Sequence, residues 1–269
     1  MTEPASADDK AVLLEQIRRQ VWTGHNIPLS STESTLGSEK ELIGDDARTI
    51  TIKKLIGRFV ARKPARVADL GSLEGGVSFE LAREGHEVTG IEGRPSNFEK
   101  AELIRRYAGL PNLRFELRDV KTLGEHGGTF DAVVCCGLLY HLDNPFSFLR
   151  TLRKVTGPEG LLFIDTHVAP DDPSAHGGTY AAALSPIATL DGYEGRWFAE
   201  PSGGSVLDQQ WSAVSNERSF WPTRRALIRA IHHAGFPTIL EIFGRFPIDG
   251  EFELRDRFSR VWLAAVADL

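Results

Sequence analysis

The sequence is poor in cysteine and has no long apolar run, and each shortage excludes a class of protein. Its only two cysteines, Cys135 and Cys136, are adjacent. Neighbours on a strand point to opposite faces, so these two are poorly placed to bridge each other. No CxxC pair or other metal-ligand spacing occurs. No apolar run approaches the length of about 18 residues that a membrane-spanning helix needs, so we expect no such helix.

The chain also lacks an excess of basic residues. Its net charge is −6 and its pI is about 5.8, whereas nucleic-acid-binding proteins usually carry basic patches. A nucleic-acid partner is therefore not expected. The first ten residues, MTEPASADDK, are polar and acidic and do not read as a signal peptide. We expect a soluble, cytoplasmic protein, and the sequence leaves the oligomeric state open, a homodimer included.

The most informative stretch is residues 66–95, RVADLGSLEGGVSFELAREGHEVTGIEGRP. An apolar run ends in a glycine turn at 71–76, a helix-like segment follows, and a second apolar strand ends at Glu92. This is the first half of a nucleotide-binding βαβ unit. Glycines let the backbone approach a ligand, and an acid about 20 residues further on can accept hydrogen bonds from ribose hydroxyls.

The glycine turn differs from the dinucleotide fingerprint. G-x-G-x-x-G requires glycine at position 73, where this chain has Leu73. A pyrophosphate would be cradled poorly, but a ligand with a ribose and no phosphate loses nothing. A glycine-rich turn in some other α/β protein is the alternative. The motif resembles that of class I S-adenosylmethionine (SAM) methyltransferases, in which the loop faces the methionine part of SAM and the acid holds the ribose.

Strand and helix patterns alternate beyond residue 62. Strands are predicted at 66–71, 87–92, 113–118, 130–136, 160–167, 237–243 and 259–267. Helices are predicted at 76–84, 96–108, 146–155 and 223–234, after two N-terminal helices at 11–21 and 47–59. Alternation predicts a parallel sheet with helices on both faces. No helical pattern separates the last two strands, so they are expected to form an antiparallel hairpin at the sheet edge.

The predicted fold is therefore α/β: a Rossmann-like, seven-stranded, mostly parallel sheet with a terminal antiparallel hairpin and an N-terminal helical lid. The strand number and the reversed hairpin are also what the methyltransferase resemblance implies. Residues 1–62 are expected to form the helices and lid, and residues 63–269 the SAM-binding core. Within the core, residues 168–222 show no sustained period. Such long structureless loops are usually functional, and we interpret this one as a substrate-recognition insertion.

Four strand ends supply the predicted cofactor site. The resemblance implies that Glu92 holds the ribose, that Asp119 accepts a hydrogen bond from the adenine amino group and that Val120 packs on the ring. One acid at a strand end is commonplace, but two at successive strand ends behind a glycine loop are harder to explain as solvated surface. The predicted cofactor-binding residues are Gly71, Ser72, Gly75, Glu92, Gly93, Arg94, Asp119, Val120, Cys136 and Gly137.

Tyr140 and His141 follow the fourth strand, whose end is expected near the sulfonium of SAM. A hydroxyl or amine must lose its proton when it is methylated, and the ordinary pKa of histidine suits that step. His141 is thus the candidate base; the alternative is that it caps the next helix or bonds a backbone carbonyl. Tyr140 and His167 are further catalytic candidates. The two histidines together lack a carboxylate that would complete an obvious metal triad, so no metal is predicted.

Residues 20–243 as a whole resemble a bacterial methyltransferase group that includes the tRNA wobble-uridine carboxymethyltransferases and many small-molecule enzymes. Four blocks carry the likeness: GHNIPL…ST, DLGSLEGGVSFELA, GLLYHLDNP and NERSFWPTRRALIRAIHHAGF. The tRNA enzymes use a carboxylated SAM and carry a basic N-terminal extension. This front end is short and is not basic overall, so a small-molecule acceptor (a sugar, a lipid or a secondary metabolite) fits better.

The acceptor pocket is predicted to combine aromatic walls with a few polar anchors. Each aromatic side chain taken alone is more often core packing than substrate contact. The predicted substrate residues are Tyr180, Tyr193, Trp197, Trp211, Trp221, Asn216, His25 and Asn26. Three hypotheses remain open: a SAM-dependent O- or N-methyltransferase acting on a small molecule, a tRNA-modifying enzyme, and a non-catalytic SAM-binding module.

Overall fold

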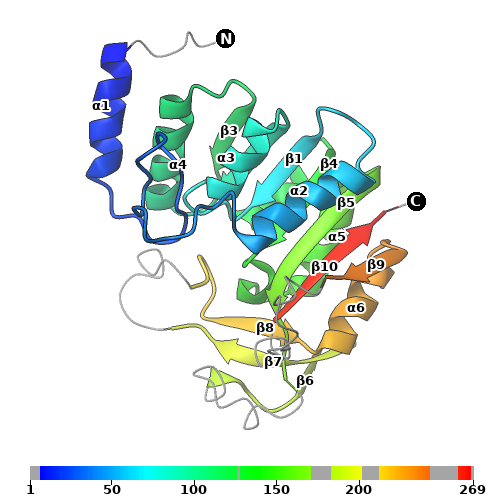
Figure 1. The fold of residues 1–269 in the computed structure, drawn as a ribbon. Coiled ribbons are helices and arrows are strands. Elements are labelled where there is room, and N and C mark those ends of the chain that lie inside the picture. Colours follow the sequence, from blue (N-terminus) through cyan, green and yellow to red (C-terminus); the bar gives the residue numbers. More distant parts are fainter. Residues whose placement is uncertain (1–6, 126–127, 171–182, 202–211, 243–259, 268–269) are drawn as a thin grey trace, which may run out of the picture. The chain divides into compact units, whose positions relative to one another are not determined.

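The computed structural model describes residues 7–125, 128–170, 183–201, 212–242 and 260–267. Seven strands form one sheet in the order β3-β2-β1-β4-β5-β10-β9 (Figure 1). They are β1 (Arg66–Leu70), β2 (Glu87–Glu92), β3 (Leu113–Leu117), β4 (Phe130–Cys136), β5 (Thr156–His167), β9 (Thr238–Glu241) and β10 (Arg260–Val266). β2 pairs in parallel with β1 and β3, whereas β10 is antiparallel to β5 and β9. The predicted Rossmann-like sheet with a reversed pair ending at the edge is confirmed.

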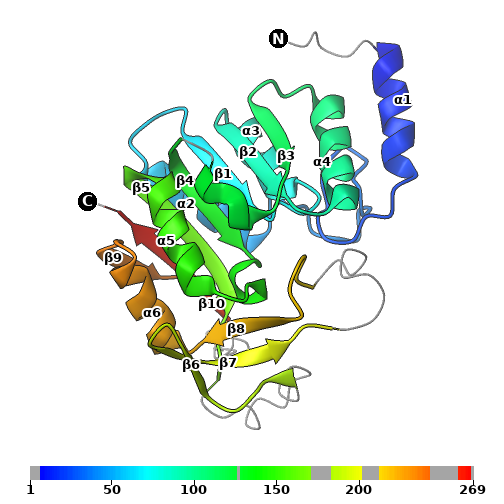
Figure 2. The same cartoon turned by 180° about the vertical axis from the view of Figure 1, so that it is seen from behind.

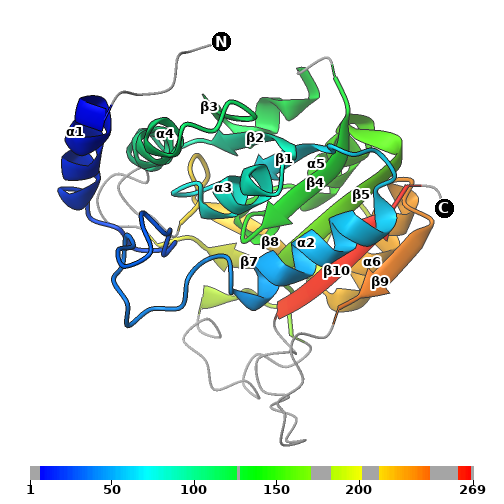
Figure 3. The ribbon, with the colours of Figure 1, turned by 45° about the horizontal axis from the view of Figure 1, so that its top comes forward.

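The chain divides into two compact units, residues 1–122 with 130–132, and residues 123–129 with 133–269. The first unit holds β1 to β3 and the helices α1 (Ala7–Arg18), α2 (Ala47–Phe59), α3 (Gly76–Arg83) and α4 (Pro95–Ala108). α1 packs on α4, which also contacts β2 and β3, and α2 packs on α3 (Figure 3). The N-terminal residues therefore belong to the same unit as the glycine turn.

Local sequence explains the helix boundaries in this unit. The Asp46 carboxylate caps α2 by accepting the N–H groups of Arg48 and Thr49, the usual role of an acid at this position. α4 begins at Pro95 and ends before Gly109, whose φ is 64°. That combination of proline at the start and a left-handed glycine after the end is common in helices.

The second unit holds β5, β9 and β10, a short 3₁₀ turn η2 (Leu139–His141) and the helices α5 (Pro145–Val155) and α6 (Arg224–His233). α5 packs on β5 and on α6, and α6 also contacts β9 (Figure 2). A second 3₁₀ turn, η1, spans Val120–Glu125. No helix in the described part of the chain is long and apolar enough to cross a membrane.

The segment 168–222 contains regular structure that the sequence analysis did not predict. β6 (Ala188–Leu190), β7 (Tyr193–Ala199) and β8 (Arg218–Pro222) form a second, antiparallel sheet in the order β6-β7-β8. The expectation of a segment without regular structure was wrong. The reason lies in β7, where a buried inward position is Gly195 rather than an apolar side chain. A glycine there breaks the alternation by which strands are recognised.

Candidate functional site

Two glycines of the turn after β1 adopt left-handed conformations. Gly71 and Gly75 have φ of 67° and 81°. Gly75 also needs its lack of a side chain, since a Cβ there would lie 2.7 Å from the Phe115 ring. Leu73, which occupies the position of the missing fingerprint glycine, adopts a φ of 52°. This conformation is costly for a branched aliphatic residue, so surrounding contacts must maintain it.

Glu92, at the end of β2, holds this turn in place. Its carboxylate accepts the N–H groups of Leu73 and Arg94, each at 2.8 Å. The residue is only 4% exposed, and burial raises the pKa of its carboxyl group above the ordinary value. The predicted ribose-binding acid is therefore present at the strand end and buried beside the glycine turn.

The Ser72 hydroxyl supplies a test of whether a cofactor fits here. It is buried and has no hydrogen-bond partner among the described residues. A buried polar group without a partner is unusual in a folded protein and points to a ligand or water as its partner. Ser72 is next to Leu73, in a turn that offers backbone and carboxylate groups and no phosphate cradle. These residues fit a nucleoside ligand such as SAM.

Asp119 and Val120 follow β3, as predicted. One Asp119 carboxylate oxygen accepts the Lys121 N–H at 2.9 Å, so this acid also stabilises the start of η1. Val120 is buried, with 7% of its surface exposed. Gly93 and Arg94 continue directly from Glu92 into the start of α4, where Arg94 is buried.

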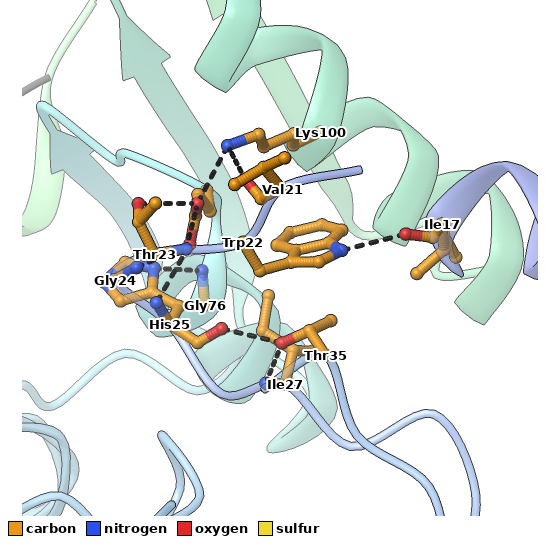
Figure 4. A network of polar contacts seen from close by, with 11 residues as sticks. Ile17, Val21, Trp22, Thr23, Gly24, His25, Ile27, Thr35, Gly76 and Lys100 are labelled. Carbon is orange, nitrogen blue, oxygen red and sulfur yellow. Dashed lines mark hydrogen bonds and ion pairs between the residues drawn. The ribbon is translucent and has the colours of Figure 1, made fainter. Parts of the chain in front are cut away.

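The buried carboxylate of Glu74, in the glycine turn, binds the N-terminal segment, whose Thr23, Gly24 and His25 are labelled in Figure 4. Its two oxygens accept the N–H groups of Thr23, Gly24 and His25 at 2.9–3.0 Å. The Lys100 ammonium group donates to Glu74 at 3.0 Å. Glu74 was not predicted as a functional residue, because an acid within a glycine turn is expected to be a solvated loop residue.

His25 and Asn26, predicted as substrate anchors, lie in this network. The His25 Nδ1 accepts the Gly76 N–H at 2.9 Å, which requires an unprotonated nitrogen. Burial lowers the pKa of His25 to about 4. The Asn26 amide donates to the carbonyl oxygens of Gly37 and Lys40 and accepts the Leu36 N–H. The structure thus gives Asn26 a role in folding the segment back on itself.

In the second unit, β4 ends at Cys136 and leads through Gly137 into η2. Gly137 has a φ of 64°, and its N–H donates to the Asp165 carbonyl at 2.8 Å. Cys135 is buried and Cys136 is partly exposed, and neither forms a disulfide within the described part of the chain. The η2 turn then presents Tyr140 and His141, the two candidate residues that follow this strand.

His141 is bound by the buried carboxylate of Glu200, the residue that directly follows β7. The distance from its Nδ1 to the Glu200 Oε1 is 3.1 Å, and the Glu200 side chain is 3% exposed. Ser219 Oγ and the Ala213 N–H also donate to Glu200, at 2.7 and 3.1 Å. An ionised carboxylate only accepts hydrogen bonds, so it selects the tautomer with a proton on Nδ1. The Nε2 lone pair then remains available to take a proton.

Trp221 in β8 and Asn216, which precedes β8, bond to the main chain of η2. The Trp221 indole donates to the Tyr140 carbonyl at 2.9 Å, and the Asn216 amide donates to the His141 carbonyl at 3.0 Å. Both residues were predicted as substrate contacts; these bonds join them to the main chain of the two candidate catalytic residues. Trp221 is 2% exposed and stacks against His167, with ring centroids 4.8 Å apart.

The three candidate catalytic side chains lie together. The Tyr140 ring centroid is 4.2 Å from that of His141 and 4.6 Å from that of His167. Arg260 lies 5.8 Å from the Tyr140 ring and forms a two-pronged ion pair with Asp165, at 2.6 and 2.7 Å. The structure therefore brings one aromatic residue and two imidazoles to the same end of β4 and β5.

The remaining predicted substrate residues have separate surroundings. Tyr193 stacks on Phe146, and its hydroxyl bonds His233 Nδ1 at 2.8 Å. Trp197 is partly exposed and lies 4.2 Å from the Arg218 guanidinium. Tyr180 and Trp211 fall outside the described residues. Within the described ranges, no group of three or more His, Cys, Asp or Glu side chains is arranged to hold a metal ion.

Residues 47–241 match the family model described as a methyltransferase domain. The chain belongs to this family. The predicted methyltransferase domain is therefore confirmed, and neighbours of the same fold were solved with S-adenosylhomocysteine (SAH), the product that forms from SAM.

Relatives and solved structures agree with this assignment at different levels. The chain is 31% identical to a tRNA U34 carboxymethyltransferase of Trichodesmium erythraeum, over 51% of this chain and 40% of that protein. It is 33% identical to a ubiquinone biosynthesis O-methyltransferase of Xanthomonas axonopodis pv. citri, over 46% of this chain and 54% of that protein. The chain thus spans about half the length of the curated relatives it matches. The N-terminal domain of EvdMO1, solved with SAH and D-fucose, has the same fold, with a TM-score of 0.70, 23% identity and coverage of 97% and 96%.

Several buried acids were not predicted from the sequence. Glu74 and Glu200 are two of them, and a third, Asp69 in β1, accepts the Ser78 hydroxyl at 2.6 Å. Burial raises the pKa of Asp69 to about 6. A signal for Asp69 was available, since it interrupts an apolar strand directly before the glycine turn. Glu200 lies in a segment without periodicity, where no pattern distinguishes a buried acid from a solvated one.

Proposed function

We propose that this protein transfers a methyl group from SAM to a hydroxyl or amine of a small molecule such as a sugar, a lipid or a secondary metabolite. The observation that carries the proposal is the pairing of His141 with the buried Glu200 carboxylate, beside Tyr140 and His167. A histidine whose Nδ1 is held by a carboxylate has a defined Nε2 acceptor, which is what a general base requires.

The first unit would hold the cofactor. The turn from Gly71 to Gly75 would face the methionine part, and Glu92 would accept hydrogen bonds from the ribose hydroxyls. Asp119 would accept from the adenine amino group while Val120 packs on the ring. The buried Ser72 hydroxyl, which has no partner in the described structure, would gain one from the ligand. Cys136 and Gly137, at the end of β4 in the second unit, were also predicted as cofactor contacts.

When bound, SAM would supply a methyl group on a positively charged sulfur, which the acceptor oxygen or nitrogen would take up as the bond between that carbon and the sulfur broke. The acceptor's proton passes to His141 Nε2. Glu200 stabilises the imidazolium that results, because its negative charge lies 3.1 Å from the ring. Most of the acceleration would come from holding the acceptor in line with the methyl group.

A small-molecule acceptor is favoured by charge and by relatives of this class. The chain carries a net charge of −6, which opposes binding to a polyanion. Some similar proteins bear names of small-molecule enzymes, the ubiquinone biosynthesis O-methyltransferases among them. The tRNA relatives name the competing function, which would use a carboxylated cofactor.

The deciding experiment is native mass spectrometry of the purified protein, followed by incubation with SAM carrying a deuterated methyl group. We expect retained SAM or SAH, and label transfer to one member of a panel of sugars, quinols and amines that includes D-fucose. The His141→Ala variant should keep the retained ligand and lose the transfer. A retained carboxylated SAM, or salt-sensitive transfer to bulk tRNA, would overturn the small-molecule proposal. Failure to take up SAM would overturn the enzyme proposal itself.

A further inference from the structure

The glycine turn and the N-terminal segment 21–25 are joined by one carboxylate. Glu74 lies within the turn and is completely buried. It accepts three consecutive main-chain N–H groups, from Thr23, Gly24 and His25, and the Thr23 hydroxyl as well. Consecutive N–H groups that converge on one anion form a concave anion-binding site. Here the anion comes from the chain itself.

The same segment is held from two further directions. The Lys100 ammonium group donates to the Val21 carbonyl at 2.5 Å and to Glu74 at 3.0 Å, and it lies 5.9 Å from the Trp22 ring. On the other side, the Gly76 N–H donates to His25 Nδ1. Figure 4 shows Val21, Trp22, His25, Gly76 and Lys100 close together. Both oxygens of the Glu74 carboxylate therefore accept hydrogen bonds from segment 21–25, and the Lys100 ammonium group balances its negative charge.

The turn carries backbone strain directly beside Glu74. Leu73 has a φ of 52°, a left-handed conformation that a leucine avoids. Its N–H is bound by Glu92, the acid proposed to hold the ribose. Backbone strain of this kind persists only where several neighbouring contacts together hold the residue in its unfavourable conformation. Glu92 holds the N–H group of Leu73, and the next residue in the chain, Glu74, is bound to segment 21–25.

We propose that Glu74 is a positioning residue for the cofactor. By binding segment 21–25, it holds Leu73 in the left-handed conformation and so presents Ser72 and Glu92 in the arrangement that binds SAM. Attachment of segment 21–25 and binding of SAM or SAH then favour each other, because coupling between two sites is reciprocal. This inference rests on the proposed use of SAM and adds a structural determinant of its affinity.

The test uses the full chain and SAH as the titrated ligand in calorimetry. We expect Glu74→Gln to weaken SAH binding by about tenfold, a common size for coupling between sites. The matched control is Glu80→Gln, which removes another buried carboxylate of the same unit, one whose ion-pair partners are Lys53 at 2.8 Å and Arg83 at 2.9 Å rather than segment 21–25. This control should lower the melting temperature without changing the SAH affinity.

A second variant separates positioning from a merely structural role. Glycine adopts a φ of 52° without strain, so Leu73→Gly should make the turn less dependent on Glu74. We expect Glu74→Gln to weaken SAH binding in the wild-type background and to have little effect in the Leu73→Gly background. Hydrogen exchange of the Thr23, Gly24 and His25 amides should slow when SAH is added.

Each alternative outcome is decisive. Equal losses of affinity in Glu74→Gln and Glu80→Gln would show general destabilisation and overturn the inference. If Glu74→Gln lowered SAH affinity equally in the wild-type and Leu73→Gly backgrounds, the proposal that Glu74 acts through the conformation of Leu73 would be overturned. A wild-type chain that does not bind SAH would overturn this inference together with the proposed function, which distinguishes that failure from the other two.

Discussion

Glu92 accepts the main-chain N–H of Leu73 at 2.8 Å, so the acid proposed to hold the ribose also fixes the strained residue of the glycine turn. Replacing Glu92 by glutamine leaves one oxygen to accept hydrogen bonds and presents an NH₂ group to an N–H donor. We expect SAH affinity to fall by about 10- to 100-fold, since hydrogen bonds to charged groups are worth about 1.5–3 kcal/mol.

Titration calorimetry checks this expectation against Glu87→Gln, a control on the same strand. Glu87 begins β2 and is exposed, so its loss should leave SAH affinity unchanged. The pKa of Glu92 is raised by burial. SAH affinity of the wild type should therefore fall as the pH approaches that raised value from above, and this fall should be absent in Glu92→Gln. A pH dependence that is identical in the two proteins would contradict the assignment.

The pairing of His141 with Glu200 leads to graded effects on turnover. His141→Ala removes the base and should lower turnover on the order of 10²–10⁴-fold with SAH affinity nearly intact. Glu200→Gln can present its amide nitrogen to the ring and so favour the wrong tautomer, and we expect a smaller loss. Ser219→Ala removes one donor to Glu200 and should change turnover least. The label-transfer assay, with an acceptor found in the panel, measures all three.

The order of these effects is the informative result. If Glu200→Gln matched wild type across the pH range while His141→Ala was inactive, Glu200 would serve packing alone. If His141→Ala retained most of the turnover, positioning of the acceptor would account for the reaction without a base. Calorimetry with SAH on each variant separates either outcome from a loss of cofactor binding.

Periodic features of the sequence predicted the sheet well. The strands that end at Glu92 and Cys136 have a clear apolar pattern and were located at nearly their observed bounds. The glycine turn and its distant acid were recognisable because nucleotide binding requires both in a fixed order. Backbone conformations that many nucleotide-binding proteins require can therefore be recognised in the sequence.

Tertiary contacts of single polar residues could not be predicted in this way. Nothing in the sequence indicates that Glu74 binds main-chain groups about 50 residues earlier in the chain, or that Glu200 binds His141. Trp221 and Asn216 were expected in a pocket, yet they bond the carbonyl groups of η2. The sequence shows that aromatic and polar residues are concentrated in one segment. Which of these residues hold the main chain in place, and which are left to contact a ligand, depends on the fold.

Gly195 in β7 allows close contact with β8 and is therefore a point of high sensitivity. A Cβ at this position would lie 2.3 Å from the Trp221 carbonyl oxygen and 2.4 Å from the Phe220 ring. We expect Gly195→Ala to destabilise the protein by about 1–3 kcal/mol, as overpacking does. The control is Gly57→Ala in α2, where a Cβ meets nothing within 4 Å. There alanine should stabilise by about 0.5–1 kcal/mol. Urea unfolding that ranked the two variants in the opposite order would contradict the packing of β7 on β8.

His25 links protonation to the attachment of segment 21–25. Burial lowers its pKa from 6.5 to about 4 in the folded protein. Between these values the unfolded chain binds the proton that the folded chain excludes, so the free energy of unfolding falls as the pH falls from 6.5 to 4. The stabilisation at stake is about 1–3 kcal/mol. Asp69 acts in the opposite direction, because its pKa is raised from 3.8 to about 6 and its contribution is lost as the pH rises through that range.

His25→Asn separates these two opposing groups. The Asn side-chain oxygen can accept the Gly76 N–H in place of Nδ1, but it does not titrate. Thermal unfolding at pH 4.5, 5.5 and 6.5 should therefore show the variant losing less stability than wild type on acidification, because only the Asp69 contribution, which grows as the pH falls, remains of the two. Asp69→Asn should show the reverse, a steeper loss than wild type. Parallel curves for wild type and His25→Asn would mean that His25 titrates alike in the folded and unfolded chains, and that its bond to Gly76 does not depend on a neutral ring.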